Sequence, residues 1–363
     1  MKKPIKSALK VQKGIKQPSS VNNESVDKFK KRKRLIFSAE ELSNGILNGD
    51  RTILSRAISI VESHLPEHQE IAQKVVNSCI PYSGKSKRIG ITGVPGAGKS
   101  SFIDVFGKKI TSMGYKLAVL AIDPSSNISR GSILGDKTRM EKLSSDPLAY
   151  IRPSPASGTL GGVASKTREA MLLCEAAGFN VIFIETVGVG QSETLVRSMV
   201  DFFLLLMLAG AGDELQGIKR GIMELADTIA ITKSDGDNIS TARKAKGEYL
   251  NALHLMPPAK SGWIPDVVTC SSIKNLGLDE LWKIIADYFE FTKNNTYLEK
   301  QRNTQSLEWL HSTIKERLHD EFYLNKMMNT SIFTAEKKVL SGQLSPNIAA
   351  SQLLEEFHNK LTK

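Results

Sequence analysis

One stretch of the sequence decides the fold: Arg88-Ile89-Gly90-Ile91-Thr92-Gly93-Val94-Pro95-Gly96-Ala97-Gly98-Lys99-Ser100. It begins as a short apolar strand and ends in residues 93–100, which match the pattern G-x-x-x-x-G-K-S. The glycines allow backbone amides to turn toward phosphate oxygens, and a helix beginning near Lys99 adds its dipole. We therefore predict a phosphate-binding loop between a strand and a helix.

This phosphate-binding loop gives roles to two side chains. We expect the Lys99 ammonium to contact the β- and γ-phosphates and the Ser100 hydroxyl to ligate Mg²⁺. The alternative is a glycine-rich turn that binds nothing, and the strand before it and the helix after it argue against that. The nucleotide contacts expected from this segment are Gly93, Val94, Pro95, Gly96, Ala97, Gly98, Lys99, Ser100 and Ser101.

Two acidic residues stand where they could complete a metal site. Asp123 and Glu185 each follow a run of apolar residues, and the glycine-containing segment 186–190 follows Glu185. Mg²⁺ prefers hard oxygen ligands, so we predict Ser100, Asp123 and Glu185 in its environment, with Asp136 as a further candidate. The other interpretation is that each acid only caps the turn after its strand.

A second motif, residues 232–235, follows another apolar run and points to the base. The carboxylate of Asp235 could accept from both N1–H and the 2-amino group of guanine. Adenine has neither donor, so such a site would reject it. The aliphatic stem of Lys233 could lie over the base and the phosphate-binding loop. We therefore predict that the bound nucleotide is GTP or GDP.

One residue departs from the usual form of this motif. Thr232 stands where GTPases of this type usually have Asn, and its single hydroxyl cannot make all the bonds of an amide. The turn at 270–272 comes after the next apolar run, where backbone amides can contact the guanine oxygen. Ser271 and Ser272 are the residues expected to supply those amides.

Apolar runs alternate with helical patterns through the middle of the chain. This alternation predicts an α/β fold, a P-loop NTPase with a mainly parallel sheet, flanked by N-terminal and C-terminal helical segments. Ligands would then bind at the carboxyl ends of the strands. The expected strands are 88–92, 117–122, 181–184, 202–208, 228–231 and 267–269, with helices at 99–113, 163–177 and 239–255 among those between them.

The patterns divide the chain into four parts. These are a disordered basic tail at 1–36, an N-terminal helical domain at 37–82, a GTPase domain at 83–292 and C-terminal helices at 293–363. Asp50 and Ser345-Pro346 are expected helix starts, and a helix is expected from Pro66 to Cys79. Spacing alone leaves open whether the C-terminal helices pack on their own domain or form a dimerisation arm.

Charge and composition exclude several classes of protein. The net charge is +11, but residues 1–34 carry twelve lysines or arginines against two acids, so +10 of it belongs to the tail. A nucleic-acid binder would need a basic face on the folded domain, so we expect no nucleic-acid partner. No apolar run reaches the roughly 18 residues of a membrane span, and the amino end lacks a secretory signal. We expect a cytoplasmic protein, or one of the mitochondrial matrix if the source is eukaryotic.

Longer strings along the chain resemble one family. Together with the phosphate-binding loop, the sequence over about residues 38–360 resembles the MeaB/ArgK family of P-loop GTPases, to which methylmalonic aciduria type A proteins belong. The strings that carry this resemblance are 123–126, 132–140, 152–155 and 158–164, then Glu185-Thr186-Val187-Gly188-Val189-Gly190-Gln191-Ser192-Glu193 and Gly212-Asp213-Glu214-Leu215-Gln216-Gly217-Ile218-Lys219.

The resemblance implies a function and partners. It implies a GTP-hydrolysing chaperone that gates adenosylcobalamin loading and protects an acyl-CoA mutase, methylmalonyl-CoA mutase or a relative. It also implies a homodimer joined through the C-terminal helices. The candidate catalytic residues are Lys99, Gln191, which could orient the attacking water, and Lys219, which could enter the site when the partner binds. We expect slow turnover without that partner.

Two other functions remain open from the sequence. A metal-insertion GTPase would need a Cys/His cluster near its nucleotide site, and Cys79, Cys174 and Cys270 are far apart without metal-ligand spacing. A P-loop ATPase or kinase linked to transport is the second alternative, and Asp235 argues against ATP as its nucleotide.

Overall fold

The computed structural model describes residues 37–63, 65–122, 140–153, 160–186, 192–209 and 220–361. The chain divides into two compact units, Met1–Ser38 and Ala39–Lys363, and every described helix and strand belongs to the second. The tail predicted at 1–36 lies outside the described residues. The domain boundaries predicted near residues 82 and 292 fall within the second unit and stay predictions.

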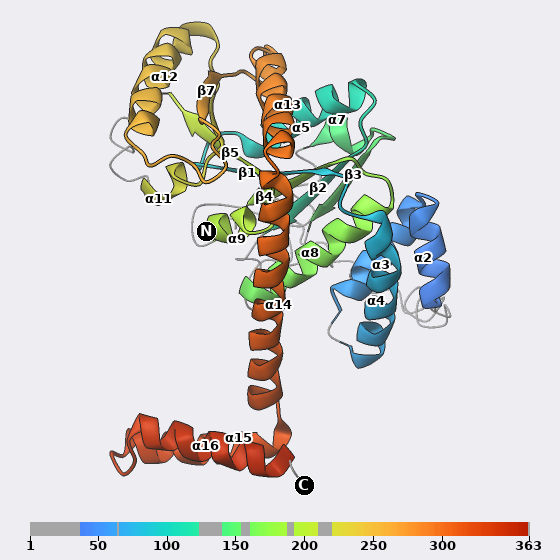
Figure 1. The fold of residues 1–363 in the computed structure, drawn as a ribbon, viewed down its shortest axis with the longest axis vertical. Coiled ribbons are helices and arrows are strands. Elements are labelled where there is room, and N and C mark those ends of the chain that lie inside the picture. The colour runs from blue at the N-terminus through green and yellow to red at the C-terminus, as the bar shows by residue number, and fades with distance from the viewer. Residues whose placement is uncertain are drawn as a thin grey trace, which may run out of the picture. The chain divides into compact units, whose positions relative to one another are not determined.

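The described residues form one sheet of seven parallel strands in the order β3-β2-β4-β1-β5-β6-β7, which confirms the predicted α/β fold (Figure 1). Six of its strands lie where the apolar runs predicted them, and the edge strand β3 was missed. The strands are β1 (Lys87–Gly93), β2 (Leu117–Ile122), β3 (Ala149–Pro153), β4 (Val181–Thr186), β5 (Phe202–Leu208), β6 (Thr228–Thr232) and β7 (Asp266–Thr269).

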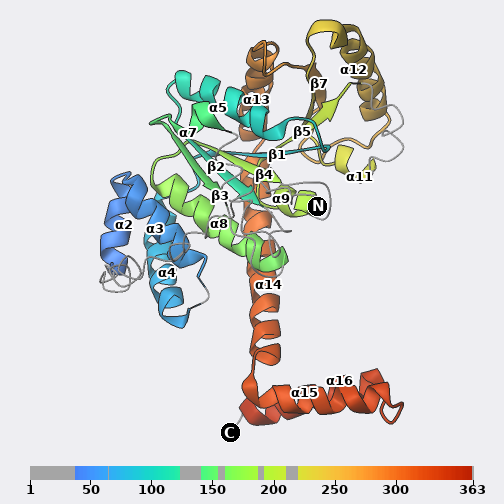
Figure 2. The same cartoon turned by 180° about the vertical axis from the view of Figure 1, so that it is seen from behind.

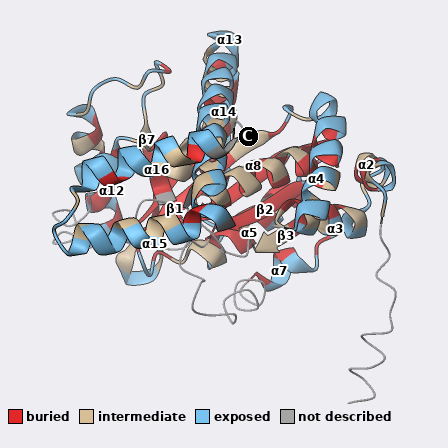
Figure 3. Cartoon of the chain, turned by 90° about the horizontal axis from the view of Figure 1, so that it is seen from below, coloured by how far each residue is buried: buried red, intermediate tan, exposed pale blue. Residues whose placement is uncertain are grey.

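Helices cover both faces of this sheet, as the views from opposite sides show (Figure 2). All six residues of β2 are buried, because a parallel strand with helices on both faces has no solvent side. Seen from below, the strands form a buried layer beneath helices whose outer faces are exposed (Figure 3). The covering helices are α5 (Lys99–Ser112), α7 (Glu141–Ser144), α8 (Leu160–Ala176), α9 (Ser192–Arg197), α11 (Arg220–Met223), α12 (Ile239–His254) and α13 (Leu278–Asn294), with the short helix η2 (Gly236–Asn238) before α12.

Three helices precede the sheet and pack against α8: α2 (Ala39–Leu47), α3 (Arg51–Val61) and α4 (Pro66–Cys79), followed by the short helix η1 (Ile80–Tyr82). The predicted start of α3 is confirmed, since the Asp50 carboxylate accepts from the amides of Thr52 and Ile53. A half-buried ion pair between Glu62 and Arg152 joins this group to β3. The N-terminal helices are therefore fixed to the outer edge of the sheet.

Three helices follow α13, namely α14 (Tyr297–Tyr323), α15 (Lys326–Leu340) and α16 (Pro346–Leu361). The predicted start of α16 at Pro346 is confirmed, whereas α15 was not predicted. Side chains in the first half of α14 contact the sheet domain, while Leu310, Ile314 and Leu318 in its second half are exposed. No helix in the described ranges is both long and apolar enough to cross a membrane.

Candidate functional site

The predicted motifs converge at one edge of the sheet. The phosphate-binding loop follows β1, Glu185 lies at the end of β4, residues 232–235 close β6 and Ser271 follows β7. Because the strands are all parallel, their carboxyl ends share this edge, where α/β sheets bind ligands. Since β1 lies between β4 and β5, the loop stands near the middle of the sheet.

The backbone of the phosphate-binding loop requires glycine at several positions. Gly96 and Gly98 have φ of 80° and 78°, the left-handed region that other residues rarely adopt. A Cβ on Gly93 would lie 2.5 Å from the Leu206 carbonyl oxygen, so only glycine lets β1 leave the sheet here. These conformations produce the concave run of amides that binds phosphate.

Lys99 is held at the beginning of the loop. Its Nζ donates to the carbonyl oxygen of Gly93 at 2.9 Å. Burial lowers the pKa of Lys99 below its ordinary value, while the carboxylates of Glu185 and Glu193 act in the opposite direction. A partly desolvated ammonium interacts more strongly with an anion than an exposed one, so Lys99 is suited to binding phosphate.

The predicted metal ligands are described only in part. The Ser100 hydroxyl lies 3.4 Å from Oε1 of Glu185, a carboxylate that is 3% exposed. A hydroxyl and a carboxylate side by side are the hard oxygen donors that Mg²⁺ takes, so these two residues fit that ion. Asp123 and Asp136 lie outside the described residues. In the described part of the chain no three His, Cys, Asp or Glu residues gather as a metal cluster.

Asp235 and Ser271, two residues expected to bind the base, lie together. The Ser271 amide, however, donates to the Leu276 carbonyl oxygen at 3.0 Å, so it is not free to contact the guanine oxygen as predicted. The Ser271 hydroxyl, fully buried, donates to Oδ2 of Asp235 and accepts from the Lys274 amide at 3.1 Å. Lys233 has a φ of 54°, and its Cε lies 4.0 Å from where a Cβ on Gly98 would be. The lysine stem thus runs over the phosphate-binding loop. Ser272 follows Ser271 and is half-buried.

Thr232 does not face the base. It is 3% exposed, and its hydroxyl donates to the carbonyl oxygen of Ala97 at 2.8 Å, with the Met207 carbonyl oxygen at 3.1 Å. From the sequence alone, Thr232 is expected only to be a weaker substitute for Asn. The structure shows that it joins β6 to the phosphate-binding loop.

A contact between two threonines supports the site and follows from no sequence motif. The Thr186 hydroxyl donates to the Thr92 hydroxyl at 2.8 Å, and both side chains are buried. This bond joins the end of β4, next to Glu185, to the end of β1, next to the loop. The only sequence signal is a pair of polar residues closing apolar runs. The candidate catalytic residues Gln191 and Lys219 lie outside the described residues.

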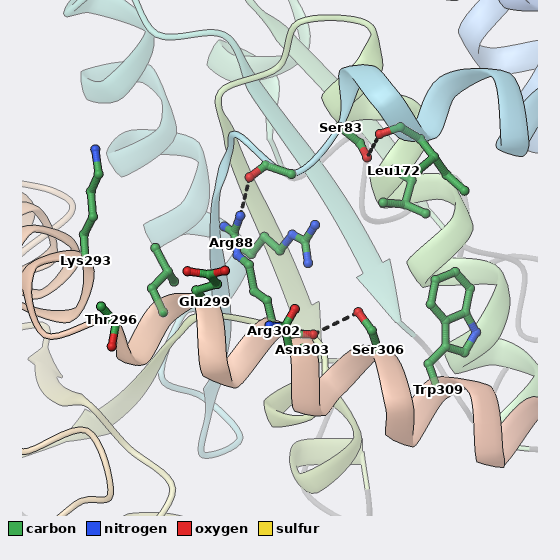
Figure 4. Close-up of a pocket in the computed structure, with 13 residues that line it drawn as sticks. Ser83, Arg88, Leu172, Lys293, Thr296, Glu299, Arg302, Asn303, Ser306 and Trp309 are labelled. Atoms are coloured by element: carbon green, nitrogen blue, oxygen red, sulfur yellow. Dashed lines mark hydrogen bonds between the residues drawn. The ribbon is translucent and has the colours of Figure 1, made fainter.

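A separate cavity of about 590 Å³ lies elsewhere in the molecule, lined by residues of η1, β1, α8, α13 and α14 (Figure 4). Arg88 stands in it at the amino end of β1, so the cavity is far along that strand from the phosphate-binding loop. Its guanidinium is paired with Glu175, and that of Arg302 with Asp201. The two arginines therefore serve the structure, and the cavity is not the nucleotide site.

Comparisons with known proteins agree with this site. A family model described as methylmalonyl-CoA mutase-associated GTPase MeaB matches residues 54–327. A mouse protein named methylmalonic aciduria type A homolog, mitochondrial, is 45% identical over 331 residues, with 88% of this chain and 80% of the mouse chain covered. An Escherichia coli protein named GTPase ArgK is 45% identical over 307 residues, with 85% and 93% covered.

A solved structure is similar in fold as well. The crystal structure of a protein named LAO/AO transport system kinase is 37% identical and has a TM-score of 0.70, with 90% of this chain and all of that chain covered. The family model spans most of the described residues, including the phosphate-binding loop and Asp235. The chain therefore belongs to the MeaB/ArgK family of P-loop GTPases.

Proposed function

We propose that the protein hydrolyses GTP with Mg²⁺ and acts as a chaperone of an adenosylcobalamin-dependent acyl-CoA mutase, gating cofactor loading and protecting the mutase. The nucleotide part is supported by the meeting of the phosphate-binding loop, Asp235 and Ser271 at one edge of the sheet. The proposed mutase partner is supported by the family model, which is described as methylmalonyl-CoA mutase-associated. We place the protein in the cytoplasm, or in the mitochondrial matrix if the source is a eukaryote. The second location is supported by the mouse relative, whose name describes that protein as mitochondrial.

The base site favours guanine on chemical grounds. Ser271 is a donor to Oδ2 of Asp235, so the carboxylate is oriented before the nucleotide arrives. A fixed carboxylate accepts two hydrogens from guanine and would face the unprotonated N1 of adenine, which repels it. Polar sites of this kind discriminate strongly because a wrong ligand leaves buried groups without a partner.

The chemistry requires positioning and charge neutralisation more than covalent steps. Lys99 and the amides of the loop stabilise negative charge as water attacks the γ-phosphate. Ser100 and Glu185 would hold Mg²⁺, which neutralises charge on the β- and γ-oxygens when it is bound. Gln191 is proposed to orient the water and Lys219 to act when the partner is bound. Turnover without the mutase is then slow.

The C-terminal helices support a homodimer as part of the proposal. Leu310, Ile314 and Leu318 lie one helical turn apart on α14 and are 54%, 45% and 57% exposed. Apolar side chains at this spacing form a stripe that needs a partner surface. A second copy of the chain presents the same stripe and can cover it by two-fold symmetry.

The test is steady-state hydrolysis of GTP, with ATP in parallel, titrated with purified methylmalonyl-CoA mutase from the same organism. Turnover that is selective for GTP and rises to saturation with mutase is the expected result. A Lys99→Ala variant gives the background rate, since it removes the phosphate-binding ammonium.

Other outcomes separate the alternatives. GTP-selective turnover that ignores the mutase would retain the GTPase and reject this partner. Preference for ATP would reject the role of Asp235. The similar solved protein is named a kinase, so transfer of phosphate to an acceptor is worth a direct check. The check uses nucleotide labelled at the γ-phosphate. If the label is recovered on an acceptor molecule and not as inorganic phosphate, the kinase alternative is favoured.

A further inference from the structure

The sheet opens at one point beside the candidate metal site. Strands β1 and β4 pair in parallel register, and the last pair toward their carboxyl ends is Ile91 and Glu185. Beyond it, β1 stays paired with β5 as far as Gly93, whereas β4 stays paired with β2 as far as Thr186. The two strands therefore separate at a fork directly after Glu185, and the phosphate-binding loop begins on one side of it.

A bond between two side chains crosses this fork. The Thr186 hydroxyl donates to the Thr92 hydroxyl at 2.8 Å, one residue beyond the last backbone pair of β1 and β4. Both side chains are at most 1% exposed, so water does not reach the bond to replace it. A buried hydroxyl that loses its partner is unfavourable, and this cost keeps the two threonines together.

The bond lies on the face of the sheet opposite to the candidate metal ligands. Successive side chains of a strand point to opposite faces, so Thr92 shares the face of Gly90, while Thr186 faces away from Glu185. The face of Gly90 packs under α9, since a Cβ on Gly90 would lie 2.8 Å from a side chain of that helix. Glu185 instead faces α5, where its Oε1 lies 3.4 Å from the Ser100 hydroxyl. The threonine pair thus holds the fork from the other side of the sheet.

We propose that Thr92 and Thr186 are positioning residues for Mg²⁺: their bond keeps the fork closed, so that the Glu185 carboxylate stays within reach of an ion at Ser100. This rests on the proposed nucleotide-binding function and extends it to two residues on the other face of the sheet. Mg²⁺ requires nearly ideal octahedral geometry, so a small movement of one ligand weakens its binding. Without the bond, the end of β4 could move away from β1, because no backbone pair beyond Glu185 joins these two strands.

The experiment removes the two hydroxyls separately and together. Thr92→Val and Thr186→Val each remove one hydroxyl and keep the shape of the side chain. The double variant removes both, and Thr186→Ser keeps the hydroxyl. Thr167→Val is the matched control, because Thr167 is also buried but lies on α8, where its hydroxyl donates to the Val163 carbonyl oxygen of the same helix.

The probe is guanylyl imidodiphosphate, a GTP analogue that is not hydrolysed. Its affinity is measured by calorimetry at a series of free Mg²⁺ concentrations and after chelation of Mg²⁺. The Mg²⁺ concentration that gives half of the full gain in affinity should rise about tenfold in Thr92→Val and Thr186→Val, the lower end of the effect of removing a group that orients a metal ligand. Affinity without Mg²⁺ should not change. Thr186→Ser and Thr167→Val should behave as the wild type does.

The double variant separates positioning from stability. Each single valine variant leaves one buried hydroxyl without its partner and should melt at a lower temperature, measured without nucleotide. The double variant leaves no such hydroxyl and should regain most of this loss. Its requirement for Mg²⁺ should nevertheless stay as high as in the single variants and no higher, because the same bond is absent in all three.

Three results would overturn the proposal. The first is a wild-type requirement for Mg²⁺ in the single valine variants. The second is a double variant whose requirement for Mg²⁺ returns to that of the wild type together with its melting temperature, which indicates a purely structural pair. The third is an equal loss of affinity with and without Mg²⁺, which indicates damage to the phosphate-binding loop. A wild-type protein whose affinity for the analogue does not depend on Mg²⁺ would instead reject the proposed function, and the inference with it.

Discussion

At the residue scale, the guanine site depends on a bond between two side chains that no local motif contains. Ser271 is 36 residues from Asp235 and comes from the loop after β7, beside β6 in the sheet. Its hydroxyl donates to the carboxylate and accepts from the Lys274 amide, so its own orientation is fixed. Ser271 therefore determines where the carboxylate points before guanine binds.

Ser271→Ala should reduce selectivity for guanine. Loss of a hydrogen bond to a charged group costs about 1.5–3 kcal/mol, so kcat/KM for GTP should fall roughly tenfold or more. The rate with ATP should stay at its low level, since Asp235 offers adenine no good partner. Steady-state kinetics with both nucleotides checks this, and Ser112→Ala, on the exposed end of α5, is the control. Unchanged GTP kinetics in Ser271→Ala would contradict the orienting role.

The sequence predicts site residues well where chemistry is local and poorly where it depends on strand register. The loop at 93–100 and the carboxylate of Asp235 follow from short motifs, and the structure brings both to one edge of the sheet. The bonds from Thr232 to Ala97 and from Thr186 to Thr92 join residues 135 and 94 positions apart. Only the order of the strands makes these pairs neighbours, and no spacing rule gives that order.

At the element scale, the first half of α14 is bound to the turn between α9 and β5. Arg302 pairs with Asp201 through two hydrogen bonds of 2.8 and 2.7 Å, and Asp201 is fully buried. Gln301 and Gln305 both donate to the Val200 carbonyl oxygen. The turn that α14 contacts follows α9, which begins at Ser192, the residue after the candidate catalytic residue Gln191.

Arg302→Met should destabilise the protein strongly. Removing one partner of a buried ion pair leaves the Asp201 carboxylate without its compensating charge, which costs about 3–5 kcal/mol. Denaturant unfolding followed by circular dichroism measures this loss. Lys283→Met is the matched control, because Lys283 pairs with Asp287 on an exposed helix face and such pairs contribute little. Equal stability of the two variants would show that α14 is held by other contacts.

Two elements escaped prediction for physical reasons. The edge strand β3 has five residues and ends in Pro153, which cannot donate to a sheet, so no clear apolar run marks it. The helix α15 contains Thr330, Ile332 and Thr334, whose branched side chains favour helix less. It forms because Asn325 caps it, accepting from the Met327 amide at 2.9 Å, and because it packs along α16.

At the scale of the whole molecule, α14 contacts the sheet domain through α8 and also carries an apolar stripe. The indole nitrogen of Trp309 donates to the Ser165 hydroxyl on α8 at 3.3 Å. Beyond it, Leu310, Ile314 and Leu318 are exposed in the single chain. Of the two interpretations that spacing left open, packing on the protein's own domain leaves these three side chains uncovered.

Replacing both Ile314 and Leu318 with Asp should convert the proposed dimer to a monomer. Burying charge in an apolar contact is unfavourable by several kcal/mol, enough to separate the copies at micromolar concentration. Light scattering after gel filtration measures the mass. Ser312→Asp, which adds charge on the opposite side of the same helix, should leave the dimer intact. A wild-type protein with the mass of one chain would reject the proposal.

The attachment of α14 has a mechanical consequence. The helix is 27 residues long, and its contact with α8 at Trp309 leaves 14 residues beyond it, a rod of about 21 Å. A tilt of only about 5° at Trp309 would carry the far end of this rod through about 2 Å. A small shift of α9 can therefore produce a larger displacement at the far end of α14. That displacement is wide enough to change which side chains meet at the apolar stripe of Leu310, Ile314 and Leu318.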